Sequence, residues 1–232
     1  MSTEYAGTEP DVGSLGALDV PLGSPTRPSW RGRLHLLGLI VAVPLVVVLV
    51  ARADGHLARV GLVVYALGLC SMLAVSTIYH RWVHTTRSRA IWRRADHATI
   101  FATIAGTCTP LSLLTFATAP AVLVLTPTWT AAALGATVKI AGWRRARPIG
   151  AALYIGIGWF GVVLMPALVA RFGPVPAMLL LAGGVIYTLG AIGFALQWPR
   201  LRPSVFSYHE VWHAATIVAA GTHLAAIWLI AT

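Results

Sequence analysis

Of the 232 residues, 57% are hydrophobic and only 10% are charged, and the mean hydropathy is +0.77. Soluble domains carry roughly a quarter charged residues, so this composition excludes an ordinary water-soluble enzyme. The formal charge of +10 does not indicate nucleic-acid binding, because the basic residues form short clusters between long uncharged stretches, as they do at a membrane surface. Cys70 and Cys108 lie in apolar stretches without a CxxC pair, so we expect neither a disulfide framework nor a cysteine metal site. The sequence predicts an integral membrane protein.

Residues 1–29 differ from the rest of the chain. They are rich in Gly, Ser, Thr and Pro and hold four acidic residues against one arginine, so they lack the apolar mass to fold. No basic region leads directly into a short apolar stretch, as it would in a signal peptide. We therefore expect a disordered tail over 1–29 and a membrane domain over 30–232.

Seven stretches are long and apolar enough to span a membrane, which takes about 20 residues each. No Asp, Glu, Lys or Arg occurs between residues 97 and 138, which is too long for one helix, and Pro120 is the expected turn within it. The predicted spans are 34–50, 60–79, 95–117, 120–138, 149–170, 174–197 and 208–230. The fold class predicted is all-α, a seven-transmembrane helix bundle.

The distribution of Lys and Arg predicts the orientation of this bundle. The N-terminal side and the loops on the same side hold fourteen of them, and the other side holds three. Because basic residues accumulate in cytoplasmic loops, we expect a cytoplasmic N-terminus and an outside C-terminus. We expect a multi-pass protein of the plasma (inner) membrane.

A few polar residues inside the predicted spans need an explanation, since ionisable groups in a membrane are costly and are candidates for function. His80 ends the second span at the cytoplasmic side, with Ser76 one turn deeper. Asp96 opens the third span at that side. His209 lies in the first turn of the seventh span, and His213 lies one turn deeper. Three helices therefore bring three imidazoles and a carboxylate to one depth.

This convergence favours a metal site. His209 and His213 share a helical face and can bind one metal, although such a pair alone is more often interfacial. With His80 they would form a catalytic zinc site with one open position, able to lower the pKa of bound water to about 7. Asp96 would position or deprotonate that water. We therefore expect His80, His209 and His213 as zinc ligands, with Asp96 and Ser76 as catalytic residues.

Alternatives remain for the two catalytic candidates. Asp96 could form a salt bridge with Arg93 or Arg94. Ser76 could donate to the water, to a ligand, or back to a carbonyl of its own helix.

The pentapeptide 209–213 also matches HExxH, in which the glutamate of a metalloprotease is a general base. Ser207-x-x-Glu210, however, has the form of a helix capping box. No Asp or Glu follows Glu210 to complete a protease site. The protease interpretation is therefore the weaker one.

The remaining histidines have simpler interpretations. His35 and His97 could be partners of the metal ligands or interfacial residues, and we favour the second role. His223 lies about 15 Å beyond His213 along the helix, so we expect it to serve packing.

Three motifs in order resemble the hemolysin III family, which is related to progestin and adiponectin receptors and, more distantly, to alkaline ceramidases. The motifs are 76–81 (STIYHR), 96–101 (DHATIF) with 105–110 (AGTCTP), and 209–213 (HEVWH). The resemblance covers 30–232 and implies a seven-helix bundle with an inner-leaflet zinc bound by His80, His209 and His213. It also implies that Asp96 contacts the zinc-bound water, with Ser76 nearby. Cys108 departs from the tyrosine expected in the family's Gly-Thr-Tyr-Thr-Pro run.

The function we expect is zinc-dependent, ceramidase-like hydrolysis of a lipid amide or ester. The expected partner is a membrane lipid, as substrate or ligand in the bilayer, and no nucleic acid. A non-enzymatic membrane sensor or regulator is an alternative, and a cytolytic pore-forming hemolysin is another. A closed structural zinc site normally has four protein ligands, whereas three are identified here, which favours catalysis. No feature of the sequence indicates an oligomeric state.

Overall fold

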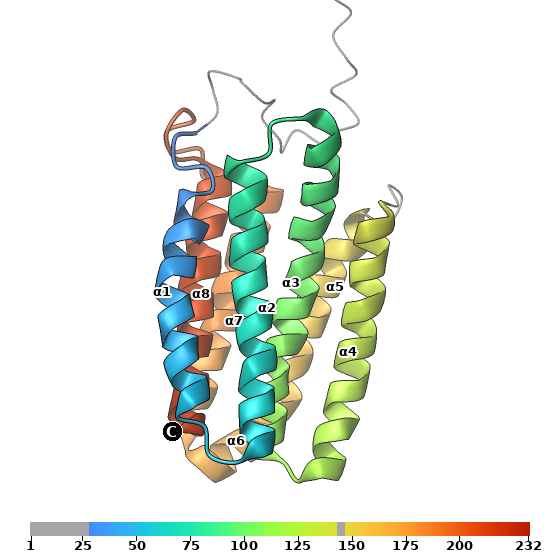
Figure 1. The fold of residues 1–232 in the computed structure, drawn as a ribbon, viewed down its shortest axis with the longest axis vertical. Helices are drawn as coiled ribbons and strands as arrows, with labels where there is room; N and C mark the ends of the chain where they lie inside the picture. Colours follow the sequence, from blue (N-terminus) through green and yellow to red (C-terminus); the bar gives the residue numbers. More distant parts are fainter. Residues whose placement is uncertain (1–27, 143–146) are drawn as a thin grey trace, which may run out of the picture.

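A computed structural model describes residues 28–142 and 147–232. The described part of the chain is made of helices without strands, and seven of its segments are long and apolar enough to cross a membrane. The predicted tail lies, up to residue 27, outside the described residues. The prediction of an all-α, seven-span membrane bundle is confirmed (Figure 1). Its elements are α1 Arg33–Ala51, α2 His56–Arg81, α3 Thr86–Thr115, α4 Thr118–Ala141, α5 Arg147–Phe160, a 3-10 turn Gly161–Leu164, α6 Met165–Phe172, α7 Pro174–Ala195 and α8 Tyr208–Ala231.

The helices follow one another around the bundle. Each contacts the next in chain order, α6 continues the span that α5 begins, and α8 returns to contact α1. α3 additionally contacts α5 and α8, so it lies nearest the interior. Many large apolar side chains face outward, as expected for a surface covered by lipid.

The turn between the third and fourth spans was expected at Pro120 and lies at residues 116–117 instead. Pro120 is in the first turn of α4, where backbone N–H groups have no partner within the helix. A proline is therefore tolerated at this position without ending the helix.

The fifth span was expected as one helix and is interrupted. Pro166 cannot donate a backbone hydrogen bond, and its ring would clash with the carbonyl of the preceding turn. The 3-10 turn Gly161–Leu164 takes up this break before α6 begins.

α3 begins at Thr86, nine residues before the predicted span. The Thr85 hydroxyl accepts a hydrogen bond from the Ser88 backbone N–H at 3.2 Å and so caps the helix. Asp96 consequently lies about three turns inside α3 rather than opening it.

Close packing of α2 against α3 fixes the relative level of their residues. A Cβ on Gly68 would lie 3.2 Å from the Thr103 Cα, and one on Gly106 would lie 3.6 Å from the Tyr65 Cα. The Thr103 hydroxyl also donates to the Gly68 carbonyl at 2.9 Å. Small residues at such contacts let membrane helices approach closely.

This register has a consequence for the candidate site. Because α2 and α3 run antiparallel, each step from Gly68 toward the end of α2 is matched by a step from Thr103 toward the start of α3. Asp96 therefore lies level with Val75 and Ser76, one turn deeper than the end of α2. Asp96 was expected at the depth of His80, and it lies instead at the depth of Ser76, one turn deeper.

Candidate metal centre

Three histidines form a buried cluster at one end of the bundle. His80 lies in the last turn of α2, and His209 and His213 lie in the first two turns of α8. One ring nitrogen of each lies within 4.8 Å of those of the other two. All three side chains are buried, so the cluster is shielded from bulk solvent.

The separations suit a tetrahedral metal ion. The Nε2 atoms of His80 and His209 are 3.4 Å apart. Two nitrogens bound tetrahedrally to zinc, each at 2.0–2.1 Å, would lie about 3.4 Å apart. The rings of His209 and His213 stack with centroids 4.7 Å apart, as expected for histidines one helical turn apart on one face.

One nitrogen in the cluster indicates that a ligand is needed. His213 Nε2 is buried and has no hydrogen-bond partner among the described residues. Buried polar atoms are normally satisfied, and an exception calls for an explanation. A divalent cation among neutral imidazoles would provide one, and such a donor set suits zinc and several other divalent ions. The residues present therefore fit a metal site.

The structure brings His35 of α1 into this site. Its ring nitrogens lie 3.1 Å and 2.9 Å from His213 Nδ1, and its side chain is buried. The interfacial role favoured for His35 from the sequence is therefore wrong. For His97 the side chain is 40% exposed and its Nδ1 lies 2.8 Å from the Arg93 carbonyl, which agrees with an interfacial residue.

Asp96 lies beside the cluster rather than in it. Its side chain is 15% exposed, and its Oδ2 is 3.5 Å from His97 Nδ1. Arg94, one of the salt-bridge partners considered, instead donates to the Ile140 carbonyl near the end of α4 at 3.3 Å.

Ser76 is fully buried and its hydroxyl has no hydrogen-bond partner among the described residues. The adjacent Thr77 hydroxyl, in contrast, donates to the Leu73 carbonyl of its own helix at 2.7 Å. The alternative in which Ser76 bonds back to its helix is thus not the arrangement found. Its hydroxyl is available to a bound molecule.

Glu210 has the structural role expected from the sequence. Its Oε2 accepts from the Ser207 backbone N–H at 2.9 Å, and the capping box at the start of α8 is complete. Its Oε1 accepts from the Arg31 guanidinium in a buried ion pair, which the sequence did not indicate. Both carboxylate oxygens are thus engaged away from the histidines, which weakens the protease interpretation further.

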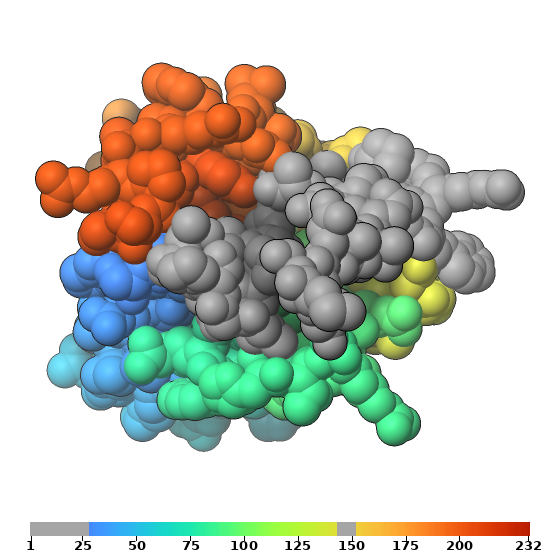
Figure 2. Space-filling model, turned by 90° about the horizontal axis from the view of Figure 1, so that it is seen from above, coloured from blue at the N-terminus to red at the C-terminus, as the bar shows by residue number. Residues whose placement is uncertain are grey.

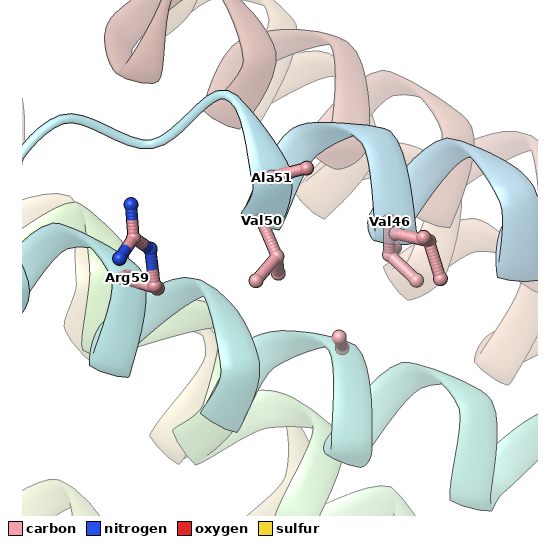
Figure 3. A pocket seen from close by; sticks show the side chains of 6 residues that line it. Val46, Val50, Ala51 and Arg59 are labelled. Carbon is pink, nitrogen blue, oxygen red and sulfur yellow. The ribbon is translucent and has the colours of Figure 1, made fainter.

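A shallow groove between α1 and α2 is a separate feature. It is lined by Val46, Val50 and Ala51 together with Arg59 (Figure 3). Arg59 lies in the first turn of α2 and His80 in the last, so the groove is at the opposite end of the bundle from the histidines. It is not part of the candidate metal centre.

Comparison with known proteins agrees with the ordered motifs. A family model described as Haemolysin-III related matches residues 24–224. The chain belongs to the hemolysin III family. This hemolysin III protein is similar to Hemolysin-3 of Bacillus cereus, with 31% identity over 182 residues that cover 77% of this chain and 80% of the relative. It is also similar to a Hemolysin-3 homolog of Bacillus subtilis (strain 168), with 26% identity over 183 residues that cover 78% of this chain and 83% of the relative.

Family membership and the seven apolar helices together identify an integral, multi-pass membrane protein. The resemblance stated from the motifs is confirmed. The buried histidine cluster is a site that could hold a metal ion.

Proposed function

We propose that this hemolysin III protein is a zinc-dependent hydrolase of an amide or ester bond in a membrane lipid. The observation that carries the proposal is the group of three buried imidazoles with ring nitrogens within 4.8 Å of one another. Three protein ligands leave a position open for substrate or water, as in catalytic zinc sites, whereas structural sites are closed by a fourth.

The chemistry follows from the surroundings of the cluster. A zinc ion held there supplies Lewis-acid polarisation and makes water a nucleophile near neutral pH. Water oxygen bonds to the lipid carbonyl carbon, the C–N or C–O bond breaks, and a proton moves to the leaving amine or alcohol. Asp96 takes the proton from water and returns it to the leaving group, while the Ser76 hydroxyl donates to a substrate oxygen.

The location of the site suits a lipid substrate. The excess of basic residues in the loops at the histidine end supports a cytoplasmic position for that end, and we propose a substrate in the inner leaflet of the plasma membrane. The interior below the histidines is apolar, with Leu69, Leu73 and Ile227 buried in one core cluster. These surroundings match an acyl chain in polarity.

The test is hydrolysis of labelled ceramides and fatty-acyl esters by protein purified into lipid nanodiscs, with and without zinc. Asp96→Asn is expected to keep its zinc and lower kcat by about a hundredfold or more, because the proton transfer is lost. Asp54→Asn makes the same change on an exposed residue between α1 and α2, at the opposite end, and is expected to keep full activity. Hydrolysis that survives zinc removal, or that is equal in Asp96→Asn and wild type, would contradict the proposal.

The two alternatives give different results. A non-enzymatic regulator would depend on the histidines without depending on Asp96. A cytolytic pore, which the names of the two relatives suggest for those proteins, would release dye from vesicles. We expect no dye release, because the bundle core is filled by buried apolar side chains.

A further inference from the structure

We propose that residues 31–35, at the start of α1, are the positioning element of the metal centre. Within this one turn, different residues contact α2 at its histidine and α8 at both of its histidine-bearing turns. The inference rests on the metal site of the proposed function and adds residues that the family motifs do not include. It is carried by four contacts, each between segments far apart in the sequence.

The chain just before α1 is fixed to the segment between α7 and α8, residues 196–207. The backbone N–H groups of Ser29 and Trp30 donate to the carbonyls of Ser204 and Val205, at 3.1 Å and 3.3 Å. Viewed from this end, the blue start of α1 lies between the orange α7–α8 segment and the green α2–α3 segment (Figure 2). The start of α1 is thus held between the two helices that carry the ligands.

Arg31 and Glu210 form the first contact with α8. The ion pair is almost completely buried, with side-chain exposures of 6% and 1%. Glu210 follows His209 directly, so the pair holds the turn of α8 from which His209 projects. A buried pair tolerates the loss of either partner poorly, because the remaining charge is left uncompensated.

Gly32 forms the contact with α2. Its φ is +74°, and a Cβ at this position would lie 2.7 Å from the His80 Cβ and 2.9 Å from the Arg81 Cγ. The backbone of α1 therefore touches the base of the His80 side chain, with no space for any other residue. This contact limits how far His80 can move away from α8.

His35 forms the second contact with α8. Its ring meets His213 edge-on, with centroids 4.0 Å apart, and a His35 nitrogen lies within hydrogen-bond distance of His213 Nδ1. His213 Nε2 is the nitrogen without a partner among the described residues. Histidines that bind metals hold their other ring nitrogen in a hydrogen bond that fixes the ring orientation. His35 provides that hydrogen bond, which leaves His213 Nε2 directed at the metal.

These contacts assign a specific role to α1. It contacts both α2 and α8. The distance between His80 and the two histidines of α8 is consequently set through residues 31–35. None of these five residues is counted among the ligands, so each acts through another residue.

The test is zinc affinity, measured by competition with a chromophoric chelator on the purified full-length protein. His35→Leu is expected to weaken zinc binding about 10–100-fold, the usual effect of losing such a hydrogen-bond partner. His35→Gln keeps a group that can bond to His213 Nδ1 and is expected to restore most of the affinity. His223→Leu removes another histidine of α8, which is half-buried and bonded to the Leu180 carbonyl, and is expected to leave zinc affinity unchanged.

Gly32 has a control in Gly55, which precedes α2 as Gly32 precedes α1. Gly55 has a φ of +86° and a ψ of 154°, so alanine strains the backbone more at Gly55 than at Gly32, whose ψ is −2°. A Cβ on Gly55 would meet nothing within 4 Å, so only Gly32→Ala pushes against His80. We expect reduced zinc affinity in Gly32→Ala alone.

The outcomes separate the two proposals. Wild-type zinc binding with unchanged affinity in His35→Leu and Gly32→Ala would overturn this inference and leave the metal site standing. An equal loss of zinc affinity in His35→Leu and His35→Gln, or in Gly32→Ala and Gly55→Ala, would also overturn it. Folded wild-type protein that binds no zinc would overturn the metal site itself, and this inference with it.

Discussion

At the start of α8, the Glu210 carboxylate is shared between the backbone of Ser207 and the guanidinium of Arg31. Neither the cap nor the ion pair is near solvent. The polar groups in both are therefore stable only while each keeps its hydrogen-bonding or ionic partner. A single unpaired charge at this depth costs more than the pair contributes. The stability of the two helix starts is therefore coupled through two residues that are 179 positions apart.

We predict a strong coupling between these two residues. Arg31→Met and Glu210→Met should each lower the free energy of unfolding by about 3–5 kcal/mol, because each leaves the other charge buried and unpaired. The double variant should lower the free energy of unfolding by clearly less than the sum of the two single variants. Unfolding followed by circular dichroism in detergent measures this, with the exposed Arg33→Met as the control. Additive effects would contradict a direct buried pair.

The histidine cluster could be predicted at the residue scale because its signals are local or depend on depth. His209 and His213 are four residues apart, and His80 falls at the same predicted depth in another helix. His35 also falls near that depth, so the same argument could have grouped it with them. Its contact with His213 joins residues 178 positions apart, however, and only the packing of α1 against α8 shows which histidine it meets.

At the scale of elements, the contact between α2 and α3 depends on small residues. A Cβ on Gly68 would lie 3.0 Å from the Ala102 carbonyl oxygen, which belongs to the backbone and cannot move independently. Because α3 carries Asp96 and α2 carries Ser76 and His80, any separation of these helices also changes the site.

We predict that Gly68→Ala destabilises the bundle. Overpacking of a tight contact costs about 1–3 kcal/mol, which exceeds the gain from replacing a helical glycine by alanine. Gly158→Ala is the control, because a Cβ on Gly158 of α5 would meet nothing within 4 Å. Thermal unfolding in detergent should show a lower Tm for Gly68→Ala only. A Tm of Gly68→Ala equal to or higher than that of the wild type would mean that the contact between α2 and α3 at Gly68 is loose.

The number of spans could be predicted from apolar length, since each span must cross the same bilayer thickness. Their ends could not be predicted equally well. Pro120 can stand in the first turn of a helix as well as in a loop, and the capping by Thr85 extends α3 beyond its apolar part. The break before Pro166 follows from the backbone geometry of proline, and the length of the apolar stretch does not predict it.

At the scale of the whole molecule, the two ends of the bundle differ in charge. Fourteen of the seventeen Lys and Arg residues belong to the N-terminal side and the loops on that side. Some of these, including Arg144 and Arg145, lie outside the described residues. The histidine cluster lies at the same end as the start of α1, so the orientation decides which leaflet the site faces.

We predict a cytoplasmic histidine end. In a background with both native cysteines replaced by serine, Thr232→Cys should react with a membrane-impermeant maleimide on intact cells, because the C-terminus lies outside. His84→Cys, between α2 and α3, should react only after permeabilisation. Both positions are exposed, so accessibility within the protein does not limit either reaction. The reverse labelling pattern would place the site in the outer leaflet.

The most direct test of the metal centre is the zinc content of detergent-purified protein by mass spectrometry. Wild type, His80→Ala, His213→Ala and Asp96→Ala are compared after zinc is supplied and excess is removed. We predict nearly one zinc per chain in wild type and Asp96→Ala, and little in the two histidine variants, because only the histidines are ligands. Folded wild type without metal, or histidine variants that keep it, would contradict a zinc site formed by α2 and α8.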